Sequence, residues 1–360
     1  MSNLAKVIDD LRIESDNYIR TVQALKAMAN ELLWDDVSRK LTPNGNAYFG
    51  MRLATSPKNR ISPNNNVTPD LVVSVPRKYN VLVEAKLALS ADAVKRQAKL
   101  LDLQKYDDDL IGLSTPSGKS RNHDIILLVA FTHAINVKDD LNRLQTEKML
   151  SFERNFALVR FMRMEEDKMW FVLELVLGCL KDKNKTDKLQ RPLAIEMEHL
   201  VSNPRFGHIK LYDAEPPLPL LMQQIHELVF NSLTRKERLA LRERTQVDIT
   251  LSISKVRQQL AETCGPGITQ VERIPDIPKS QWIRRALQAF IKLGWAEKHK
   301  QKRNTFIYHV KKRREPLGQF NKFCAKQRFK KEEEREKQRA REMEKHPLFK
   351  DLIQREHQKN

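Results

Sequence analysis

Asp70, Glu84 and Lys86 have side chains and a spacing that could support metal-assisted chemistry on a phosphate. They lie in residues 69–86, where two valine-rich runs flank a Pro-Arg-Lys-Tyr-Asn segment. Such a pattern predicts a β-hairpin. Residues two apart in a strand share a face, so Glu84 and Lys86 point the same way. If the two strands pair, the carboxylates of Asp70 and Glu84 converge.

Two converging carboxylates repel each other unless a divalent cation or a shared proton lies between them. An all-oxygen site with open positions suits Mg²⁺ or Mn²⁺. A lysine beside it would stabilise charge that builds on a phosphate under attack, or would help to orient the attacking water. The alternative is that Asp70 caps a turn, while Glu84 and Lys86 form a solvated strand face.

The Pro-Asp pair ending at Asp70, followed on the next strand by Glu84-Ala85-Lys86, resembles the core motif of the PD-(D/E)xK nuclease superfamily. The resemblance implies a restriction-endonuclease-like α/β core, with Asp70, Glu84 and Lys86 as catalytic residues. It also implies Mg²⁺ or Mn²⁺ held by Asp70, Glu84 and the Ala85 carbonyl. Members of this superfamily can take a further acid from their first helix, which makes Glu31 a candidate metal ligand; an exposed helix acid is the competing interpretation.

The pattern around the motif predicts the other elements of a mixed α/β domain. Residues 124–133 are a continuous apolar run bounded by polar residues, which is typical of a strand buried on both faces, and we expect it to be the central parallel strand. Lysine-rich residues 181–188 predict a polar loop. We also predict helices over 4–34, 90–106 and 137–150, and strands over 47–53, 156–164 and 169–177.

The predicted helix 90–106 has a basic, amide-rich side. In several branches of the superfamily a glutamine and a tyrosine on this helix line the site, and Gln97, Gln104 and Tyr106 are the available residues here. Their spacing departs from the Q-x-x-x-Y pattern of the exonuclease-type branch. Which of them reaches the metal or the DNA therefore stays open, and a solvated helix face is the alternative.

The composition indicates a polyanionic partner. The chain has 360 residues, and 65 Lys plus Arg against 46 Asp plus Glu give a formal charge of +19, which favours nucleic acid. We expect a cytoplasmic protein without a membrane segment, because no long apolar run and no secretory leader are present. A P-loop is also absent from the sequence, so ATP-driven activity is not expected.

Residues 215–311 resemble a winged helix-turn-helix domain. A proline-rich connection at 215–219 precedes predicted helices, and a basic turn joins two predicted strands after them. The helices are expected over 220–233, 235–244, 253–260 and 280–293, and the strands over 295–298 and 305–310. In the resemblance, the helix from Ser280 is the recognition helix and the basic turn is the wing.

The expected DNA contacts follow from that resemblance. Arg and Gln can read base edges in the major groove, whereas wing lysines more often contact phosphates. Many winged helices mediate protein contacts only, which is the alternative. The expected contacts are Lys279, Gln281, Arg284, Arg285 and Gln288 on the helix, and Lys298, His299, Lys300, Lys302 and Arg303 on the wing.

The last part of the chain, residues 312–360, predicts a basic helical tail of mixed charge without an apolar stripe, either solvated or disordered. Its patch at 347–353 could dock a partner protein, and a homodimer is also open. The predicted domains are thus 1–214, 215–311 and 312–360. Together they predict a metal-dependent DNA endonuclease or exonuclease for phage defence, restriction or transposition. The alternatives are a non-catalytic DNA-binding regulator or scaffold, and RNA as substrate.

Overall fold

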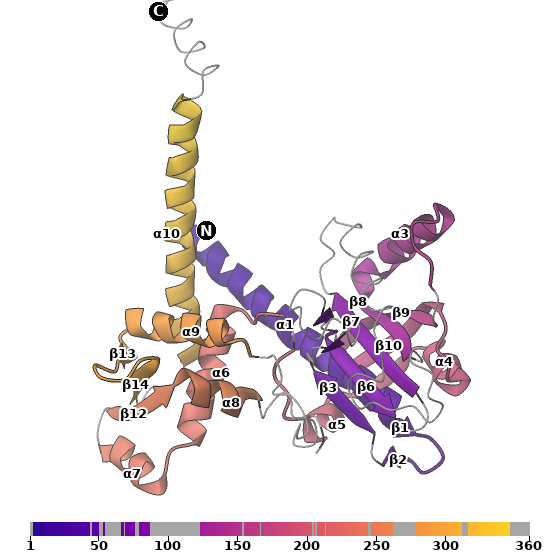
Figure 1. The fold of residues 1–360 in the computed structure, drawn as a ribbon, viewed down its shortest axis with the longest axis horizontal. Helices are drawn as coiled ribbons and strands as arrows, with labels where there is room; N and C mark the ends of the chain where they lie inside the picture. Colours follow the sequence, from indigo (N-terminus) through magenta and orange to yellow (C-terminus); the bar gives the residue numbers. More distant parts are fainter. Residues whose placement is uncertain are drawn as a thin grey trace, which may run out of the picture.

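A computed structural model shows a seven-stranded sheet and a three-stranded sheet with long flanking helices (Figure 1), and two short pairs of strands, β1-β2 and β4-β5. It describes residues 3–43, 45–49, 53–54, 66–67, 69–75, 79–86, 123–152, 155–165, 167–203, 205, 207–212, 214–243, 246–261, 278–311 and 316–345. Among these residues no helix is long and apolar enough to cross a bilayer. The predicted helix 90–106 lies outside the described residues.

The larger sheet is mixed and has seven strands in the order β11-β10-β9-β8-β7-β6-β3. β7, β8 and β9 run parallel, and the other neighbours are antiparallel. The predicted hairpin is confirmed as β6 and β7, and the predicted central parallel strand is confirmed as β8. The strands are β3 (Asn46–Phe49), β6 (Leu71–Val75), β7 (Tyr79–Lys86), β8 (His123–Ala130), β9 (Phe156–Glu165), β10 (Met169–Gly178) and β11 (Leu193–Glu196).

Helices cover both faces of this sheet. α1 (Asn3–Leu33) buries apolar side chains spaced three or four apart, such as Leu25, Met28 and Leu32, against one face, as expected for an amphipathic helix. α3 (Ala134–Thr146) packs on the other face, where its core includes Leu82 of β7. Val83, next along β7, belongs to the α1 side. Successive residues of β7 therefore face different helical layers.

Short elements complete this part, and one of them corrects a prediction. The loop predicted over 181–188 is wrong, because α4 (Lys183–Leu189) is a helix whose N-cap Asp182 accepts a hydrogen bond from the Lys185 backbone nitrogen at 3.2 Å. The composition of α4 is rich in lysine, but one side of the helix, with Lys185, Thr186 and Leu189, is buried. The others are β1 (Trp34–Asp35), β2 (Lys40–Leu41), β4 (Leu53–Ala54), β5 (Asn66–Val67), the 3₁₀ helix η4 (Phe131–His133) and α5 (Met197–Ser202).

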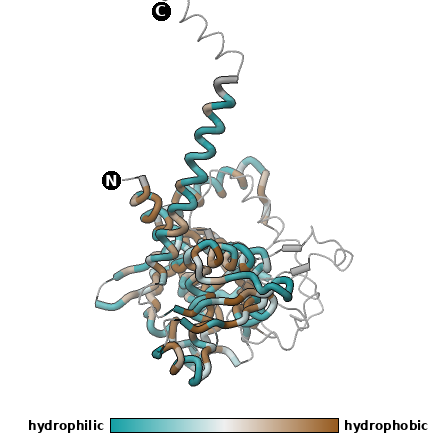
Figure 2. The backbone as a smooth tube through the Cα atoms, turned by 90° about the vertical axis from the view of Figure 1, so that its left-hand side faces the viewer, coloured by the Kyte–Doolittle hydropathy of each residue, from teal (hydrophilic) through white to brown (hydrophobic). Residues whose placement is uncertain are grey.

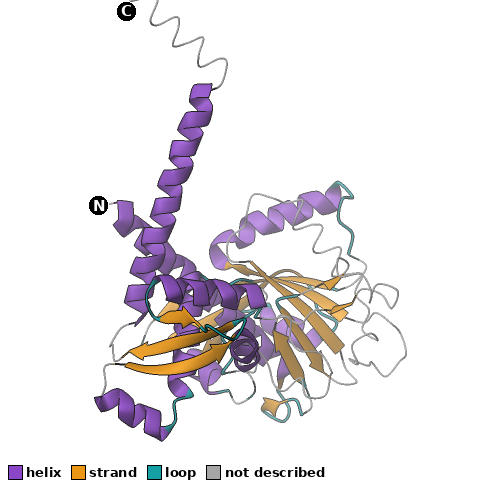
Figure 3. Cartoon of the chain, turned by 60° about the vertical axis from the view of Figure 1, so that its left-hand side comes forward, coloured by secondary structure: helices purple, strands orange, loops and turns teal. Residues whose placement is uncertain are grey.

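The smaller sheet has three antiparallel strands in the order β12-β14-β13, and Figure 3 shows it apart from the larger sheet. Its first strand was not predicted, although its sequence alternates polar and apolar residues as a half-buried strand does. The strands are β12 (Gln246–Ser252), β13 (Ala296–Lys298) and β14 (Thr305–Lys311). The helices, at nearly the predicted positions, are α6 (Leu218–Asn231), α7 (Arg235–Glu243), α8 (Ile253–Ala261) and α9 (Ser280–Lys292).

The last described helix, α10 (Pro316–Lys345), differs from the expected tail in its first part. Phe320, Cys324 and Ala325 are buried there, and the helix packs against α1 and α6. Arg328 donates a hydrogen bond to Glu14 of α1 at 2.6 Å. From Lys330 to Glu342 the side chains are exposed, and Figure 2 shows this part of the helix as mostly hydrophilic. The prediction of a helix without an apolar stripe is therefore wrong for the first part of α10, which packs into the hydrophobic core.

His226 of α6 lies where α10 meets the smaller sheet. Its Nδ1 is 2.9 Å from the Tyr308 hydroxyl oxygen, and its ring centroid lies 5.4 Å from that of Trp295 and 6.2 Å from that of Phe320. Burial lowers the pKa of His226 below its ordinary value of 6.5, and the nearby charge of Glu227 opposes that effect only in part. This aromatic cluster therefore favours the neutral imidazole.

We expect the free energy of unfolding to decrease as the pH is lowered, because of His226. As the pH drops below about 6.5, the unfolded chain binds a proton that the folded chain resists, so the free energy of unfolding decreases until the folded-state pKa is reached. His226→Gln should remove this contribution, so that its difference from the wild type shrinks between pH 8 and pH 5 in urea unfolding. Tyr308→Phe, which keeps the buried imidazole, should retain the pH dependence. A wild-type advantage over His226→Gln that is constant with pH would contradict the assignment.

Candidate metal centre and nucleic-acid interface

The register of β6 and β7 brings two carboxylates to opposed positions. Leu71, the first residue of β6, pairs with Val83, so the preceding residue Asp70 lies opposite Glu84. Oδ2 of Asp70 accepts a hydrogen bond from the backbone nitrogen of Ala85 at 2.7 Å. Asp70 is 4% exposed and Glu84 is 2% exposed. The two acids thus lie side by side below the surface on one sheet face.

Lys86 is the last residue of β7, two positions after Glu84. Glu84 pairs with Leu127 and Lys86 with Val129 on the parallel strand β8. By strand alternation, both residues belong to the face that α3 covers. The backbone of Lys86 therefore lies at the edge of the sheet where β7 and β8 end, while its side chain lies outside the described residues.

These donors fit a divalent cation. Two opposed carboxylates supply the hard oxygen ligands that Mg²⁺ prefers, and Mg²⁺ is commonly bound by one or two carboxylates with water completing the shell. Within the described ranges no group of three or more His, Cys, Asp or Glu side chains could hold a metal. Asp70, Glu84 and the Ala85 carbonyl are the residues that could hold such an ion here.

Glu31 lies elsewhere in the structure. Its Oε1 is 3.4 Å from Nζ of Lys185 and 3.1 Å from Nζ of Lys188. Lys185 also donates to the backbone oxygens of Glu31 and Trp34, both at 2.6 Å. Glu31 is 3% exposed, so it is not the exposed acid of the alternative interpretation. Glu31 therefore does not lie beside Asp70 and Glu84. Instead, it links the end of α1, which packs on the other face of the sheet, to α4.

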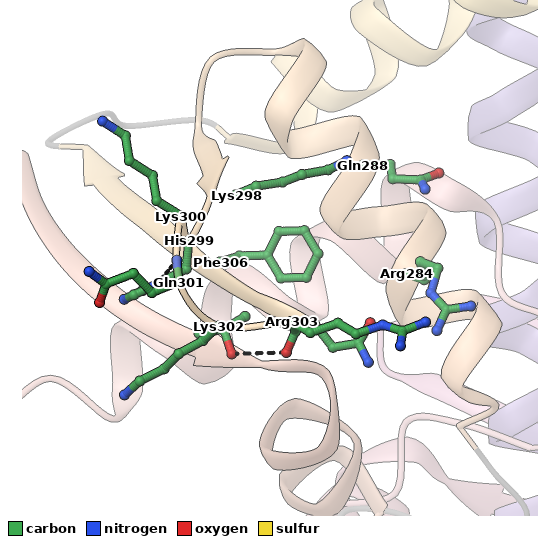
Figure 4. Close-up of a pocket in the computed structure, with 11 residues that line it drawn as sticks. Arg284, Gln288, Lys298, His299, Lys300, Gln301, Lys302, Arg303 and Phe306 are labelled. Atoms are coloured by element: carbon green, nitrogen blue, oxygen red, sulfur yellow. Dashed lines mark hydrogen bonds between the residues drawn. The ribbon is translucent and has the colours of Figure 1, made fainter.

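A basic pocket lies between α9 and the turn joining β13 to β14. It has a volume of about 480 Å³. Figure 4 shows Lys298 and Arg303 extending toward α9, while Lys300 and Lys302 point outward. Five of its lining side chains are cationic and none is acidic, so it concentrates positive potential. The lining residues are Arg284, Gln288, Lys298, His299, Lys300, Gln301, Lys302, Arg303, Asn304, Thr305 and Phe306.

The structure brings together part of the predicted DNA-contact set. Arg284 and Gln288, four apart on α9, share the side that faces the pocket. Lys279, Gln281 and Arg285 are not among the lining residues. Arg285 instead pairs with Glu215 at 2.5 Å, and Lys279 Nζ lies 5.4 Å from the Trp282 ring centroid. Gln97 and Gln104 lie outside the described residues.

Three polar lining residues, Gln301, Asn304 and Thr305, were not predicted as contacts. Asn304 has a φ of 58°, in the left-handed region that asparagine tolerates better than most residues. Its backbone oxygen accepts from the nitrogen of Ile253 at 3.1 Å, which joins the turn to α8. An asparagine at the end of a basic turn is the signal that could have identified this position.

Comparison with known proteins adds no assignment. No family model matches the chain, and no curated protein or solved structure matches it. The carboxylate pair and the basic pocket are therefore the observations on which a function can be argued.

We expect Glu31 to contribute to stability and not to metal binding. Glu31→Gln should lower the free energy of unfolding by about 1–3 kcal/mol, because it weakens a buried charged contact. Asp36→Asn, which removes the exposed partner of Lys188, should change it by less than about 0.5 kcal/mol. Added Mg²⁺ should raise the melting temperature of Glu31→Gln as much as that of the wild type. Loss of this shift in Glu31→Gln alone would make Glu31 a metal ligand.

Proposed function

We propose that this protein is a metal-dependent nuclease of the PD-(D/E)xK type that hydrolyses phosphodiester bonds in DNA. The observation that carries the proposal is the opposed, buried pair Asp70 and Glu84 beside the Ala85 backbone. Lys86 follows at the same edge of the sheet. The carboxylates and the Ala85 carbonyl supply the metal ligands, and Lys86 supplies the positively charged side chain, that phosphodiester hydrolysis with Mg²⁺ or Mn²⁺ requires.

Each residue has a distinct role in the proposed mechanism. The site would hold Mg²⁺, whose chemistry there would be activation of water and neutralisation of charge on the phosphate. Asp70, Glu84 and the Ala85 carbonyl hold the ion. The hydrogen bond from the Ala85 nitrogen keeps the Asp70 carboxylate oriented. The ammonium group of Lys86 stabilises the negative charge that grows on the phosphate oxygens as the water attacks.

The architecture supports a restriction-endonuclease-like core in this proposal. An antiparallel hairpin, β6 and β7, leads into the parallel strands β8 and β9, and helices cover both faces. The acids lie at the end of that hairpin, so the mixed sheet itself positions the site.

The smaller sheet and its helices support a winged-helix DNA-binding domain. α8 and α9 precede the β13–β14 hairpin, and β12 pairs with β14 beside it. In this proposal α9 enters the major groove of DNA, and Lys298, Lys300 and Lys302 contact phosphates from the wing. Such a protein would act on DNA in the cytoplasm, in phage defence, restriction or transposition.

A non-catalytic DNA-binding regulator or scaffold is the second candidate. The basic pocket favours it, because that pocket could bind DNA without any contribution from Asp70 or Glu84. The opposed buried acids favour the nuclease, since a scaffold has no use for two adjacent carboxylates that repel each other.

We expect Mg²⁺-dependent plasmid nicking to fall by about 10²-fold or more in each of three variants, Asp70→Asn, Glu84→Gln and Lys86→Ala. Each change removes charge stabilisation from the transition state. Binding of the same DNA in a shift assay should persist in all three variants. Asp139→Asn, an exposed acid on α3, is the matched control and should cleave like the wild type. Equal cleavage by every variant would refute the site, and binding without cleavage under any metal would favour the scaffold.

The double variant Lys300→Gln/Lys302→Gln should bind duplex DNA more weakly and with a weaker salt dependence. Each lost phosphate contact is expected to reduce the slope of log affinity against log salt by about 0.9. Lys330→Gln/Lys331→Gln, on the exposed part of α10, removes the same charge and should leave the slope unchanged. Equal effects of the two double variants would point to net charge alone and against the pocket.

A further inference from the structure

Arg160 of β9 lies in the same cross-strand row as Lys86. Lys86 pairs with Val129 of β8, and Val129 pairs in turn with Arg160. Paired residues of neighbouring strands share a face, so Arg160 belongs to the face that carries Asp70 and Glu84. At about 4.8 Å per strand, Arg160 is about 10 Å from Lys86 along the row. It therefore lies beside the proposed metal pair and not within it.

Two contacts fix the orientation of the Arg160 guanidinium. Its Nε and Nη2 donate to the same oxygen, Oε2 of Glu174, at 2.9 and 2.6 Å, and Glu174 lies directly opposite on β10. Its Cζ lies 4.4 Å from the ring centroid of Phe131. Phe131 directly follows β8 and is 43% exposed. The guanidinium is thus held at the edge of the sheet where β7 and β8 end.

The same geometry leaves part of the guanidinium available. Nη1 of Arg160 makes no hydrogen bond to any residue that the structure describes. The side chains of Arg160 and Glu174 are 24% and 23% exposed, so water or a ligand reaches the pair. A planar, oriented guanidinium with free donors is well suited to phosphate.

We propose that Arg160 binds a backbone phosphate of the substrate strand next to the phosphodiester bond that is cleaved. The proposal rests on the proposed nuclease function and adds a substrate-binding residue to it. Glu174 and Phe131 act as positioning residues, because they hold the guanidinium before the substrate arrives. The row from Lys86 to Arg160 then follows the path of the DNA strand across the edge of the sheet.

Arg163, three residues further along β9, provides a matched control. It lies on the opposite face of the strand by alternation, where it pairs with Glu165 and lies 3.6 Å from Asp16 of α1. Arg160→Gln and Arg163→Gln remove one positive charge each from the same strand. If only general electrostatic attraction matters, both changes should weaken DNA binding equally. If Arg160 contacts a phosphate, only Arg160→Gln should weaken it.

Two measurements on the full-length protein test the proposal. Steady-state cleavage of a short duplex with Mg²⁺ should show a KM raised about tenfold in Arg160→Gln, with kcat nearly unchanged, since the contact is made before and during the reaction. Without metal, the slope of log affinity against log salt should weaken by about 0.9. Arg163→Gln should match the wild type in both. If Arg160→Gln has a lowered melting temperature, Arg160→Lys takes its place and should give an intermediate KM.

The outcomes separate this proposal from the proposed function. Cleavage by the wild type, with Arg160→Gln unchanged in both KM and salt slope, would overturn the role of Arg160 and leave the nuclease intact. Equal losses in Arg160→Gln and Arg163→Gln would also overturn it. A wild type that cleaves no DNA, combined with a weaker salt slope in Arg160→Gln alone, would refute the nuclease and support the phosphate contact.

Discussion

The register between β6 and β7 is the constraint on which the candidate metal centre depends. Side chains alternate between the α1 and α3 faces along these strands, and Leu71 pairs with Val83. A slip of one residue in either strand would send Asp70 and Glu84 to different faces. It would also expose apolar side chains that both helical layers now bury. The hydrophobic core thus fixes the alignment of these two carboxyl groups on one face of the sheet.

The sequence predicted this part of the fold well because its signals are local and strong. An uninterrupted apolar run marks β8, valine-rich runs mark β6 and β7, and α1 has a roughly helical apolar period. β12 was missed although its alternation of polar and apolar residues is a local strand signal, whereas its pairing with β14 is visible only in the structure. The first part of α10 was missed because Phe320 and Cys324 are sparse among charged residues, and their burial depends on helices far away in the sequence.

The candidate site residues divide in the same way. Asp70 and Glu84 could be paired from the hairpin pattern, since strand alternation is a local rule. Glu31 could not be placed, because its partners Lys185 and Lys188 lie on a helix whose composition resembles a loop. Among the basic residues, composition identified the turn after β13, whereas only the structure separates Arg284, which lines the pocket, from Arg285, which pairs with Glu215.

The packing of α10 on α1 has a consequence for the order in which the chain becomes complete. Glu14 and Arg328 are 314 residues apart in sequence, yet they meet where these two helices pack. Chains generally fold from the N-terminal side as they are synthesised, and α1 is made well before α10. The side of α1 toward α10 therefore stays uncovered until the segment around Arg328, 314 residues after Glu14, has been made. The packing of α1 is completed only by that later segment.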